Sequence, residues 1–305
     1  MKVLITGGAG FIGSHVVEAL LARGEAVTVL DDFNDFYDPA LKRRNVAGFP
    51  QVIEGDIRGK LPAGKFDAII HLAARAGVRP SLAQPRLYSD VNIAGTQNLL
   101  EFARESGIRK FVFASSSSVY GVNQKIPFSE DDPIFKPISP YAATKLAGEA
   151  LCHVYHHLYG LDMVCLRFFT VYGPRQRPDL AIRKFTQAIL AGKPIDVFGD
   201  GSTRRDYTHI DDILQGVLAA LDRKLGYEVI NLGESRTVEL CELISLIEKA
   251  TGKTAKLNRQ PLQPGDVPVT FADIAKARRL LDYDPRVPIE DGIARFVHWY
   301  EHQTP

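Results

Sequence analysis

The sequence contains few of the residues that mark secreted, metal-binding or membrane proteins. Only three of its 305 residues are cysteines, Cys152, Cys165 and Cys241, and they form no CxxC pair. This spacing favours neither a zinc site nor a disulfide framework, so we expect the cysteines to pack in a core in a reducing compartment. No apolar run reaches the length that spans a bilayer, and a strand-like segment at residues 1–6 leaves no room for a secretory signal. These absences predict a cytoplasmic protein that uses no metal and no membrane.

An excess of either charge is also missing. The 37 Lys and Arg residues balance 36 Asp and Glu residues, for a formal net charge of +1. This balance gives no reason to expect a nucleic acid or a membrane surface as partner. The length suits one large α/β unit, or a cofactor domain with a smaller companion.

What the sequence does contain is an alternation of strand and helix patterns. Short runs rich in Val, Ile or Phe and bounded by Gly, Asp or Ser predict strands at residues 2–6, 26–30, 51–54, 68–71, 110–115 and 163–169. Helical patterns lie between them, at residues 12–23, 89–106 and 140–159, each followed by glycine. The alternation predicts an α/β fold with a Rossmann-type doubly wound parallel sheet.

The amino-acid composition changes after residue 172, where Pro, Arg and Gly become frequent. We expect a helix at 180–191, strands at 195–198 and 228–231, and helices at 212–221, 238–250, 274–281 and 290–302. The 212–221 helix and the 228–231 strand are expected to return to the main sheet. We therefore predict an NAD-binding domain of residues 1–171 plus about 207–235. A smaller C-terminal α/β substrate domain would comprise about 172–206 plus 236–305.

A glycine-rich loop follows the first predicted strand and opens the first helix. Gly7, Gly10 and Gly13 allow the backbone to turn tightly and to approach a pyrophosphate at the helix N-terminus. Asp31 ends the second strand about twenty residues later, where a dinucleotide-binding fold places the acid that accepts the ribose hydroxyls. A carboxylate there repels a 2′-phosphate, which favours NAD over NADP. Asp56 follows the third strand, where its residue type alone predicts a helix N-cap.

A second cluster of polar residues suggests hydride chemistry. Tyr141 and Lys145 are four residues apart at the start of a helix, so their side chains share one face. A tyrosine titrates near ~10 and needs a nearby cation to act as a base at neutral pH. Four serines, from Ser115 to Ser118, end the fifth strand, where a doubly wound sheet binds its ligands. The Tyr–Lys spacing and the serine run are each common when taken alone, but together they favour a catalytic site.

Several motifs in fixed order then resemble a known family. They are GGAGFIG at 7–13, SSSSVYG at 115–121, YAATK at 141–145, RFFTVYGPRQRPD at 167–179 and GDGSTRRDYTHIDD at 199–212. The chain resembles the extended short-chain dehydrogenase/reductase superfamily, and within it the nucleoside-diphosphate-sugar 4-epimerases. The resemblance implies a Rossmann domain, a small substrate domain and tightly held NAD. It also implies a homodimer formed through the helices that begin near residues 89 and 140.

The resemblance also assigns roles to individual residues. Tyr141 would remove the proton of the sugar 4-hydroxyl while the C4 hydride passes to NAD⁺. Lys145 would hold the nicotinamide ribose and lower the pKa of that tyrosine, and Ser116 would bind the reacting oxygen. The 4-keto sugar would then turn over and regain the hydride on its other face. The resemblance also offers Asp56 as a contact to the adenine amine, the alternative to a helix N-cap. The expected NAD site comprises Gly7, Gly10, Phe11, Ile12, Gly13, Asp31, Asp32, Asn34, Asp56, Ile57, Leu72, Ala73, Ala74, Asn92, Tyr141, Lys145, Phe168 and Val171.

Two serines narrow the reaction within the family. The 4,6-dehydratases place Asp-Glu where this chain has Ser117 and Ser118, and the uronate decarboxylases have Glu in place of Ser118. Neutral serines cannot supply that acid and base, so the pattern favours simple epimerisation. A catalytically inactive NAD-binding regulatory protein is a remote alternative, since it would be expected to lose Ser116, Tyr141 or Lys145.

The sugar is predicted from weaker signals. Residues 31–45 (DDFNDFYDPALKRRN) look closest to UDP-glucuronate 4-epimerases, and UDP-glucose 4-epimerases more often have Asn in place of Thr170. Thr170 and the serines Ser116, Ser117 and Ser118 are expected to bind a C5 carboxylate, with Arg177 as a charge partner or as a solvated loop residue. We therefore predict conversion of UDP-glucuronate to UDP-galacturonate. The alternative is a UDP-glucose/UDP-galactose or N-acetylhexosamine 4-epimerase.

The nucleotide contacts follow from the same resemblance. Arg205 matches the arginine that binds the diphosphate, and Asp266 matches the acid on the uridine ribose. The strand that flanks uracil would be Asp196, Val197 and Phe198. The hexose epimerases often have a second diphosphate arginine where this chain has Gln263, so Arg79 or Lys184 would replace it, or the diphosphate would be bound more weakly.

Overall fold

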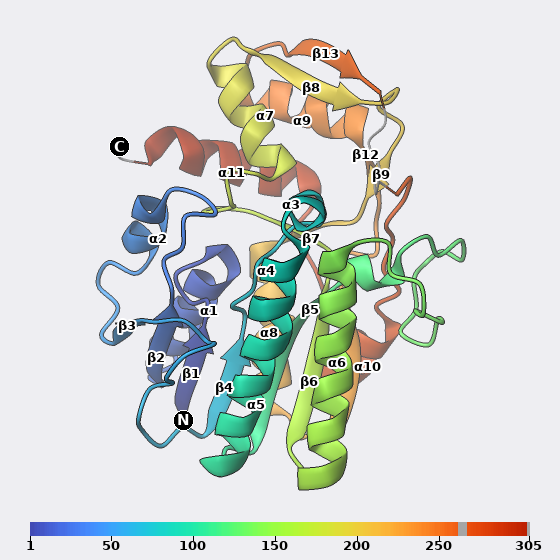
Figure 1. Ribbon diagram of the computed structural model, residues 1–305. Coiled ribbons are helices and arrows are strands. Elements are labelled where there is room, and N and C mark those ends of the chain that lie inside the picture. Colours follow the sequence, from blue (N-terminus) through green and yellow to red (C-terminus); the bar gives the residue numbers. More distant parts are fainter. Residues whose placement is uncertain (262–266, 304–305) are drawn as a thin grey trace.

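The centre of the protein is a parallel sheet of seven strands (Figure 1). The computed structural model describes residues 1–261 and 267–303. The strands are β1 (Lys2–Thr6), β2 (Ala26–Asp31), β3 (Val52–Glu54), β4 (Ala68–His71), β5 (Lys110–Ser116), β6 (Asp162–Phe168) and β11 (Tyr227–Leu232). Their order is β11-β6-β5-β4-β1-β2-β3, and every pair is parallel. The expected α/β class with a Rossmann-type sheet is confirmed.

The strand order places a crevice above β1. The chain runs from β1 outward to β2 and β3, and then returns to β4 on the other side of β1. Thr6, the last residue of β1, is paired with Leu30 on one side and His71 on the other. At such a reversal the loops separate outside the carboxyl ends of the strands, where open α/β sheets bind ligands.

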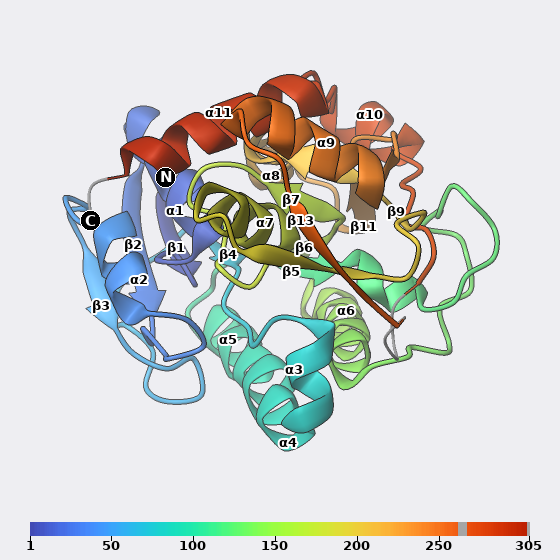
Figure 2. The same cartoon turned by 90° about the horizontal axis from the view of Figure 1, so that it is seen from above.

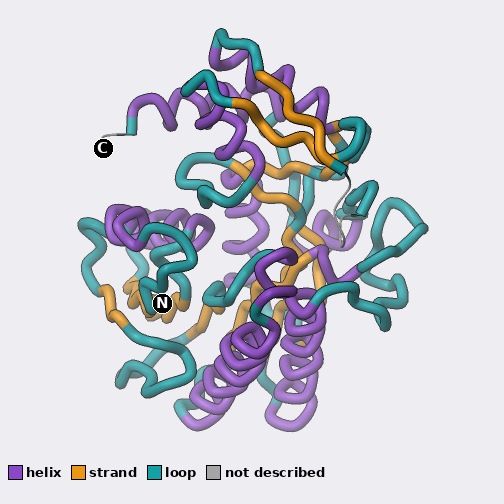
Figure 3. The backbone as a smooth tube through the Cα atoms, turned by 45° about the horizontal axis from the view of Figure 1, so that its top comes forward, coloured by secondary structure: helices purple, strands orange, loops and turns teal. Residues whose placement is uncertain are grey.

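Helices cover both faces of this sheet. The helices α1 (Phe11–Ala22), α8 (Ile210–Asp222) and α10 (Ala275–Leu281) lie on one side. The helices α5 (Gly95–Glu105) and α6 (Pro140–Tyr159) lie on the other, side by side (Figure 3). The side chains of β1 alternate accordingly, because Val3 and Ile5 pack in the first core and Leu4 packs in the second.

A third core lies beyond the carboxyl ends of the strands. It is formed by α7 (Ala181–Leu190), β8 (Pro194–Phe198), α9 (Leu240–Thr251) and α11 (Ile289–His302), and β13 (Lys256–Gln260) pairs in parallel with β8. Figure 2 shows these elements over the sheet from above. Two short pairs connect the layers: β7 (Thr170–Tyr172) with β10 (Tyr207–His209), and β9 (Arg204–Arg205) with β12 (Val238–Glu239).

Several elements differ from the expectation based on sequence. The single helix predicted for residues 89–106 is divided into α4 (Pro85–Ser89), a π-helical turn η1 (Asp90–Ala94) and α5, and it follows the short helix α3 (Val78–Ala83). Helix α2 (Pro39–Asn45) was not expected, because seven residues are too few to show an apolar period. The strands β7, β9, β10, β12 and β13 were also missed, since short strands outside the main sheet carry little alternation.

The cysteine expectation is correct for two of the three residues. Cys152 and Cys165 are buried in the core beside α6, whereas Cys241 is exposed at the start of α9. Within residues 1–261 and 267–303, every helix is too short or too polar to cross a bilayer. In the same ranges, no three His, Cys, Asp or Glu side chains are grouped as ligands for a metal ion.

Candidate active site

A cavity of about 490 Å³ lies between the sheet and the third core. Most of the residues predicted for the NAD and substrate sites line it. The predicted residues among the lining are Gly7, Gly10, Phe11, Ile12, Gly13, Asp31, Asp32, Asn34, Asp56, Ile57, Leu72, Ala73, Ala74, Ser116, Ser117, Ser118, Tyr141, Lys145, Phe168, Thr170, Val171, Arg177 and Arg205. The fold thus gathers into one cavity residues that are separated by up to two hundred positions in the chain.

The glycine loop is built to admit a phosphate group. Gly7 has a φ of 73°, and its amide donates to the carbonyl of Leu30 at 2.8 Å. A Cβ on Gly13 would lie 2.2 Å from the carbonyl oxygen of Gly7, so only glycine fits there. Gly10 is the N-cap of α1 and lacks a side chain, so the amides of the first turn face the cavity without a side-chain cap. This cradle fits the pyrophosphate of NAD.

The expected ribose acid lies beside the same loop. Asp31 is buried, and its carboxylate accepts hydrogen bonds from the amides of Ala9 at 3.1 Å and Phe33 at 3.0 Å. Burial raises the pKa of Asp31, while the nearby Lys42 ammonium and these amides lower it. A carboxylate fixed in this place suits the ribose hydroxyls of NAD.

Lys42 was missed by the sequence reasoning. Its ammonium donates to the carbonyl of Asn34 at 3.0 Å, lines the cavity, and lies 5.0 Å from the ring centroid of Tyr37. Burial lowers the pKa of Lys42, while Asp31 and Asp32 raise it. In the sequence, Lys42 belongs to a basic run at 42–44. Such a run is equally typical of the solvated end of a helix, so it did not indicate a cavity residue.

Two predicted cofactor residues form hydrogen bonds within the protein, and Asp56 is the one of them that lines the cavity. The segment after Asp56 is a turn rather than a helix, and the Asp56 carboxylate accepts from the amide of Arg58 at 2.8 Å. Asn92 is buried in the π-helical turn and is not part of the described lining. Its amide group bonds both the N–H and the carbonyl of Arg75 and also Thr144, so it fixes the loop after β4 to α6.

The three predicted catalytic residues converge at the end of β5. Ser116 is the last residue of that strand, and its hydroxyl accepts from the amide of Ser118 at 3.2 Å. Tyr141 is the second residue of α6, which starts where the Ser139 hydroxyl accepts from the amide of Ala142 at 3.1 Å. Lys145 lies one turn further on.

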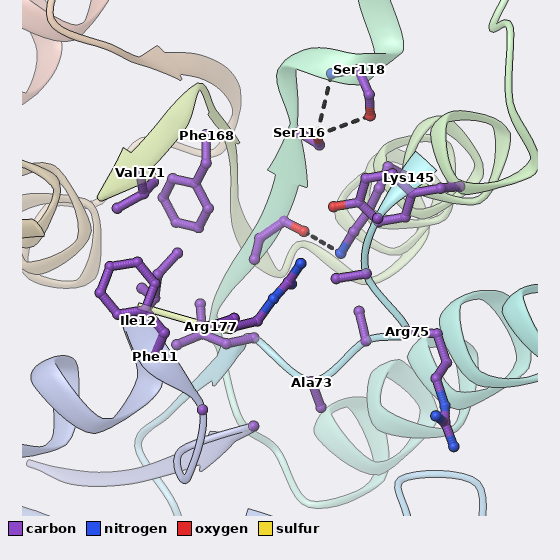
Figure 4. A pocket seen from close by; sticks show the side chains of 18 of the residues that line it. Phe11, Ile12, Ala73, Arg75, Ser116, Ser118, Lys145, Phe168, Val171 and Arg177 are labelled. Carbon is purple, nitrogen blue, oxygen red and sulfur yellow. Dashed lines mark hydrogen bonds between the residues drawn. The ribbon is translucent and has the colours of Figure 1, made fainter. Parts of the chain in front are cut away.

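Lys145 bridges the helix and the strand. Its Nζ donates to the carbonyl of Ala114 at 2.6 Å and lies 5.9 Å from the ring centroid of Tyr141 (Figure 4). Burial raises the pKa of Tyr141, whereas a hydrogen bond with Ser116 and the charge of Arg177 lower it. Burial also lowers the pKa of Lys145 to about 8. One buried corner of the cavity, the catalytic corner, therefore holds the Ser116 hydroxyl, the Tyr141 phenol and the Lys145 ammonium. Together these are the groups required to move a proton from a carbinol.

The residues predicted for a carboxylate lie beside this corner. Ser117 and Ser118 belong to the 3₁₀ turn after β5, Thr170 begins β7, and all three line the cavity. Arg177 extends from the loop before α7 into the cavity, toward the side where Lys145 donates (Figure 4). It is therefore a cavity residue, and the solvated-loop interpretation does not fit its position.

The residues predicted for the nucleotide are more dispersed. Arg205 lines the cavity, while Arg79, Lys184, Asp196, Val197 and Phe198 are not part of the described lining. Arg79 lies over the ring of Phe198 at 4.8 Å and so joins the Rossmann layer to β8. The Val197 side chain is buried in the third core, and Asp196 accepts from Asn258 at 2.8 Å. Lys184 is exposed on α7, and the predictions for Asp266 and Gln263 lie outside the described residues.

Known proteins resemble this chain over its whole length. The model of the NAD dependent epimerase/dehydratase family matches residues 3–233. The UDP-glucuronate 4-epimerase of Thermodesulfobacterium geofontis is 46% identical over 308 residues, which cover 97% of this chain and 95% of that protein. The structure of the Bacillus cereus UDP-glucuronic acid 4-epimerase with UDP-glucuronic acid and NAD has a TM-score of 0.93 at 41% identity, and 99% of each chain is covered. The Thermus thermophilus UDP-glucose 4-epimerase with NAD reaches 0.90 at 34% identity, with 100% of both chains covered.

These similarities confirm the family resemblance that the motifs indicated. The protein is an enzyme, an isomerase of the NAD-dependent nucleotide-sugar 4-epimerase type, and its cofactor is NAD. The glycine cradle and the buried Asp31 fit that cofactor. The chain belongs to the NAD dependent epimerase/dehydratase family.

Proposed function

We propose that this UDP-sugar 4-epimerase interconverts UDP-glucuronate and UDP-galacturonate. The observation that carries the proposal is a single cavity in which Arg177 and the hydroxyl residues Ser117, Ser118 and Thr170 surround the catalytic corner. A guanidinium and several hydroxyls form a typical carboxylate site, because each can donate a hydrogen bond to a carboxylate oxygen. The 46% identity with a UDP-glucuronate 4-epimerase supports the same substrate.

The proposed reaction uses Tyr141 as the base at the sugar 4-hydroxyl. Ser116 donates a hydrogen bond to the reacting oxygen, and the Lys145 ammonium stabilises the phenolate. When bound, NAD supplies the acceptor for the C4 hydride and returns it. Because Ser117 and Ser118 are neutral, they provide neither the acid nor the base that would divert the 4-keto sugar into elimination.

A uronate adds a chemical risk that the cavity has to control. Oxidation at C4 makes the sugar a β-keto acid, in which breaking of the C5–C6 bond would release CO₂. Hydrogen bonds from Ser117, Ser118 and Thr170 keep the carboxylate in one orientation. That orientation prevents loss of CO₂ when the C5–C6 bond is held out of line with the π system of the new carbonyl.

The substrate can be tested with a panel of UDP-sugars. Purified enzyme is incubated with UDP-glucuronate, UDP-glucose or UDP-N-acetylglucosamine without added NAD, and the products are followed by NMR. We expect UDP-galacturonate from the first substrate, at a kcat/KM well above that for the two neutral sugars. Conversion of UDP-glucose alone would contradict the proposal and favour the hexose epimerase.

The same assay separates an enzyme from an inactive NAD-binding protein. The substitution Tyr141→Phe removes only the phenolic oxygen of the base, so activity should fall by at least about 100-fold. Bound NAD, measured after denaturation of the purified variant, should stay at the wild-type level. Unchanged epimerase activity in this variant would exclude Tyr141 as the base.

A further inference from the structure

Arg177 is held by two neighbours before it reaches the cavity. Its Nε donates to Oδ1 of Asp179 at 2.9 Å, and its Nη2 donates to Oδ2 of the same carboxylate at 2.8 Å. The guanidinium also lies 5.4 Å from the ring centroid of Phe36, in the loop that follows β2. One edge and one face of the planar group are thus occupied by side chains of the protein.

The two parallel hydrogen bonds fix the plane of the guanidinium. A fork of this kind, through Nε and one terminal nitrogen, leaves the other terminal nitrogen directed away from the carboxylate. Within residues 1–261 and 267–303, none of the hydrogen bonds involves Nη1 of Arg177. Figure 4 shows the guanidinium directed into the cavity toward the catalytic side. The Arg177 charge also reaches this side, because it lowers the pKa of Tyr141.

Asp179 has two opposing effects on a bound carboxylate. Its negative charge opposes an anionic ligand, whereas its two hydrogen bonds keep the arginine pointed at that ligand. The Asp179 side chain is 37% exposed, so water and salt screen its charge strongly. The orientation of a long, flexible arginine has no such screening, and we expect that effect to dominate.

We propose that Asp179, with Phe36, is a positioning residue that sets the preference of the enzyme for a uronate over a neutral hexose. Asp179 holds one edge of the Arg177 guanidinium so that its free edge meets the C5 carboxylate of the sugar. Phe36, in the loop that follows β2, contacts the flat face of the same guanidinium. A neutral hexose carries no carboxylate at C5 and gains nothing from this arrangement. The inference rests on the proposed function, since it requires a uronate substrate.

The test compares two substrates in the full-length enzyme. We expect Asp179→Ala to lower kcat/KM for UDP-glucuronate about tenfold, the loss typical of one misplaced charge-assisted hydrogen bond. The value for UDP-glucose, or its inhibition constant where turnover is too slow, should change less than about twofold. In an Arg177→Ala background, Asp179→Ala should have no further effect on UDP-glucuronate. Asp179→Glu, which keeps the carboxylate, should restore part of the loss.

Asp284→Ala is the matched control. Asp284 and Arg286 form an exposed ion pair with the same two-residue spacing, and Arg286 Nε lies 2.8 Å from the carboxylate, outside the cavity. This variant should keep the wild-type ratio of the two substrates. An equal loss on both substrates in Asp179→Ala, or an additive loss in the double variant, would overturn the inference. If the wild-type enzyme does not convert UDP-glucuronate, the proposed function fails and the inference fails with it. If it does and the ratio is unchanged by Asp179→Ala, only the inference fails.

Discussion

Burial shifts the pKa values of Tyr141 and Lys145 away from those that proton transfer requires, and neighbouring groups partly reverse the shift at Tyr141. Burial alone raises the pKa of Tyr141, which keeps the phenol protonated at neutral pH. The Ser116 hydroxyl and the Arg177 charge act in the opposite direction. Lys145 contributes only while it is charged, and burial has lowered its pKa to about 8. The base therefore depends on an ammonium that is itself close to losing its proton.

This dependence predicts how kcat/KM changes with pH. The active form pairs the Tyr141 phenolate with the Lys145 ammonium, and burial raises the pKa of Tyr141 while it lowers the pKa of Lys145 to about 8. As pH rises toward 8, the phenolate fraction grows and kcat/KM should increase, whereas above about pH 8 the loss of the ammonium offsets that gain and kcat/KM should level off. Lys145→Met should lower activity by about 100-fold or more and abolish this break. Lys145→Arg keeps its charge at all accessible pH values, so kcat/KM should continue to rise above pH 8. A break at the same pH in Lys145→Arg would show that another group titrates there.

At the scale of elements, one buried ion pair fixes the catalytic helix to the sheet. Arg167 of β6 donates to Glu149 of α6 from Nε at 2.9 Å and from Nη2 at 2.8 Å, and both side chains are buried. Ser115 of β5 donates to the same carboxylate at 2.5 Å. Glu149 is one turn after Lys145, and Ser115 directly precedes Ser116. The Glu149–Arg167 ion pair therefore fixes the position of Ser116 relative to Lys145.

Removing one partner of this ion pair should lower the stability of the fold more than replacing both partners with apolar residues. Glu149→Ala leaves the buried Arg167 charge without its partner, for which we expect a loss of about 3–5 kcal/mol in the free energy of unfolding. The double change Glu149→Met with Arg167→Met removes both charges and should be more stable than the single variant. Urea denaturation measures both values. A double variant less stable than Glu149→Ala would mean that packing, rather than the unpaired charge, determines the cost.

The sequence predicted the elements of the main sheet better than the details between them. The strands around β1 and the glycine loop carry local signals, an apolar run bounded by turn residues, and these were found. The Glu149–Arg167 pair has no such signal, because its partners are on different elements and meet only in the folded chain. The buried position of Asn92 and the cavity position of Lys42 carry no local signal for the same reason, since both are decided by partners in the folded chain. The approach of Arg79 to Phe198 across the two layers also depends on tertiary packing.

At the scale of the whole molecule, we propose the division into two domains that the sequence suggested. The sheet of β1 to β6 with β11 supplies the glycine cradle, the ribose acid and the catalytic corner. The third core supplies Arg177 from the loop that leads to α7. Because α8 and β11 return to the main sheet between α7 and α9 of the third core, the chain passes between the two parts more than once.

The outer face of α5 and α6 is where we expect two copies of the chain to meet. The helices lie side by side (Figures 1 and 3), and Val154 and Leu158, one turn apart on α6, have exposed fractions of 44% and 60%. Apolar side chains exposed on one helical face favour burial against a second copy. The wild-type protein should therefore sediment as a dimer at micromolar concentration.

Leu158→Glu should weaken that dimer, because it places a charge in an apolar contact of each subunit. We expect the dissociation constant to rise at least about tenfold, since each buried leucine contributes about 1.5–3 kcal/mol. Leu257→Glu is the control, because Leu257 is 48% exposed on β13, in the other layer of the molecule. Sedimentation equilibrium of the three proteins decides the point. A monomeric wild type would contradict the expected dimer, and dimers of equal strength in all three proteins would place the contact elsewhere. Helix α6 also carries Tyr141 and Lys145, so a dimer formed here would rest on the same rigid element that positions the catalytic base.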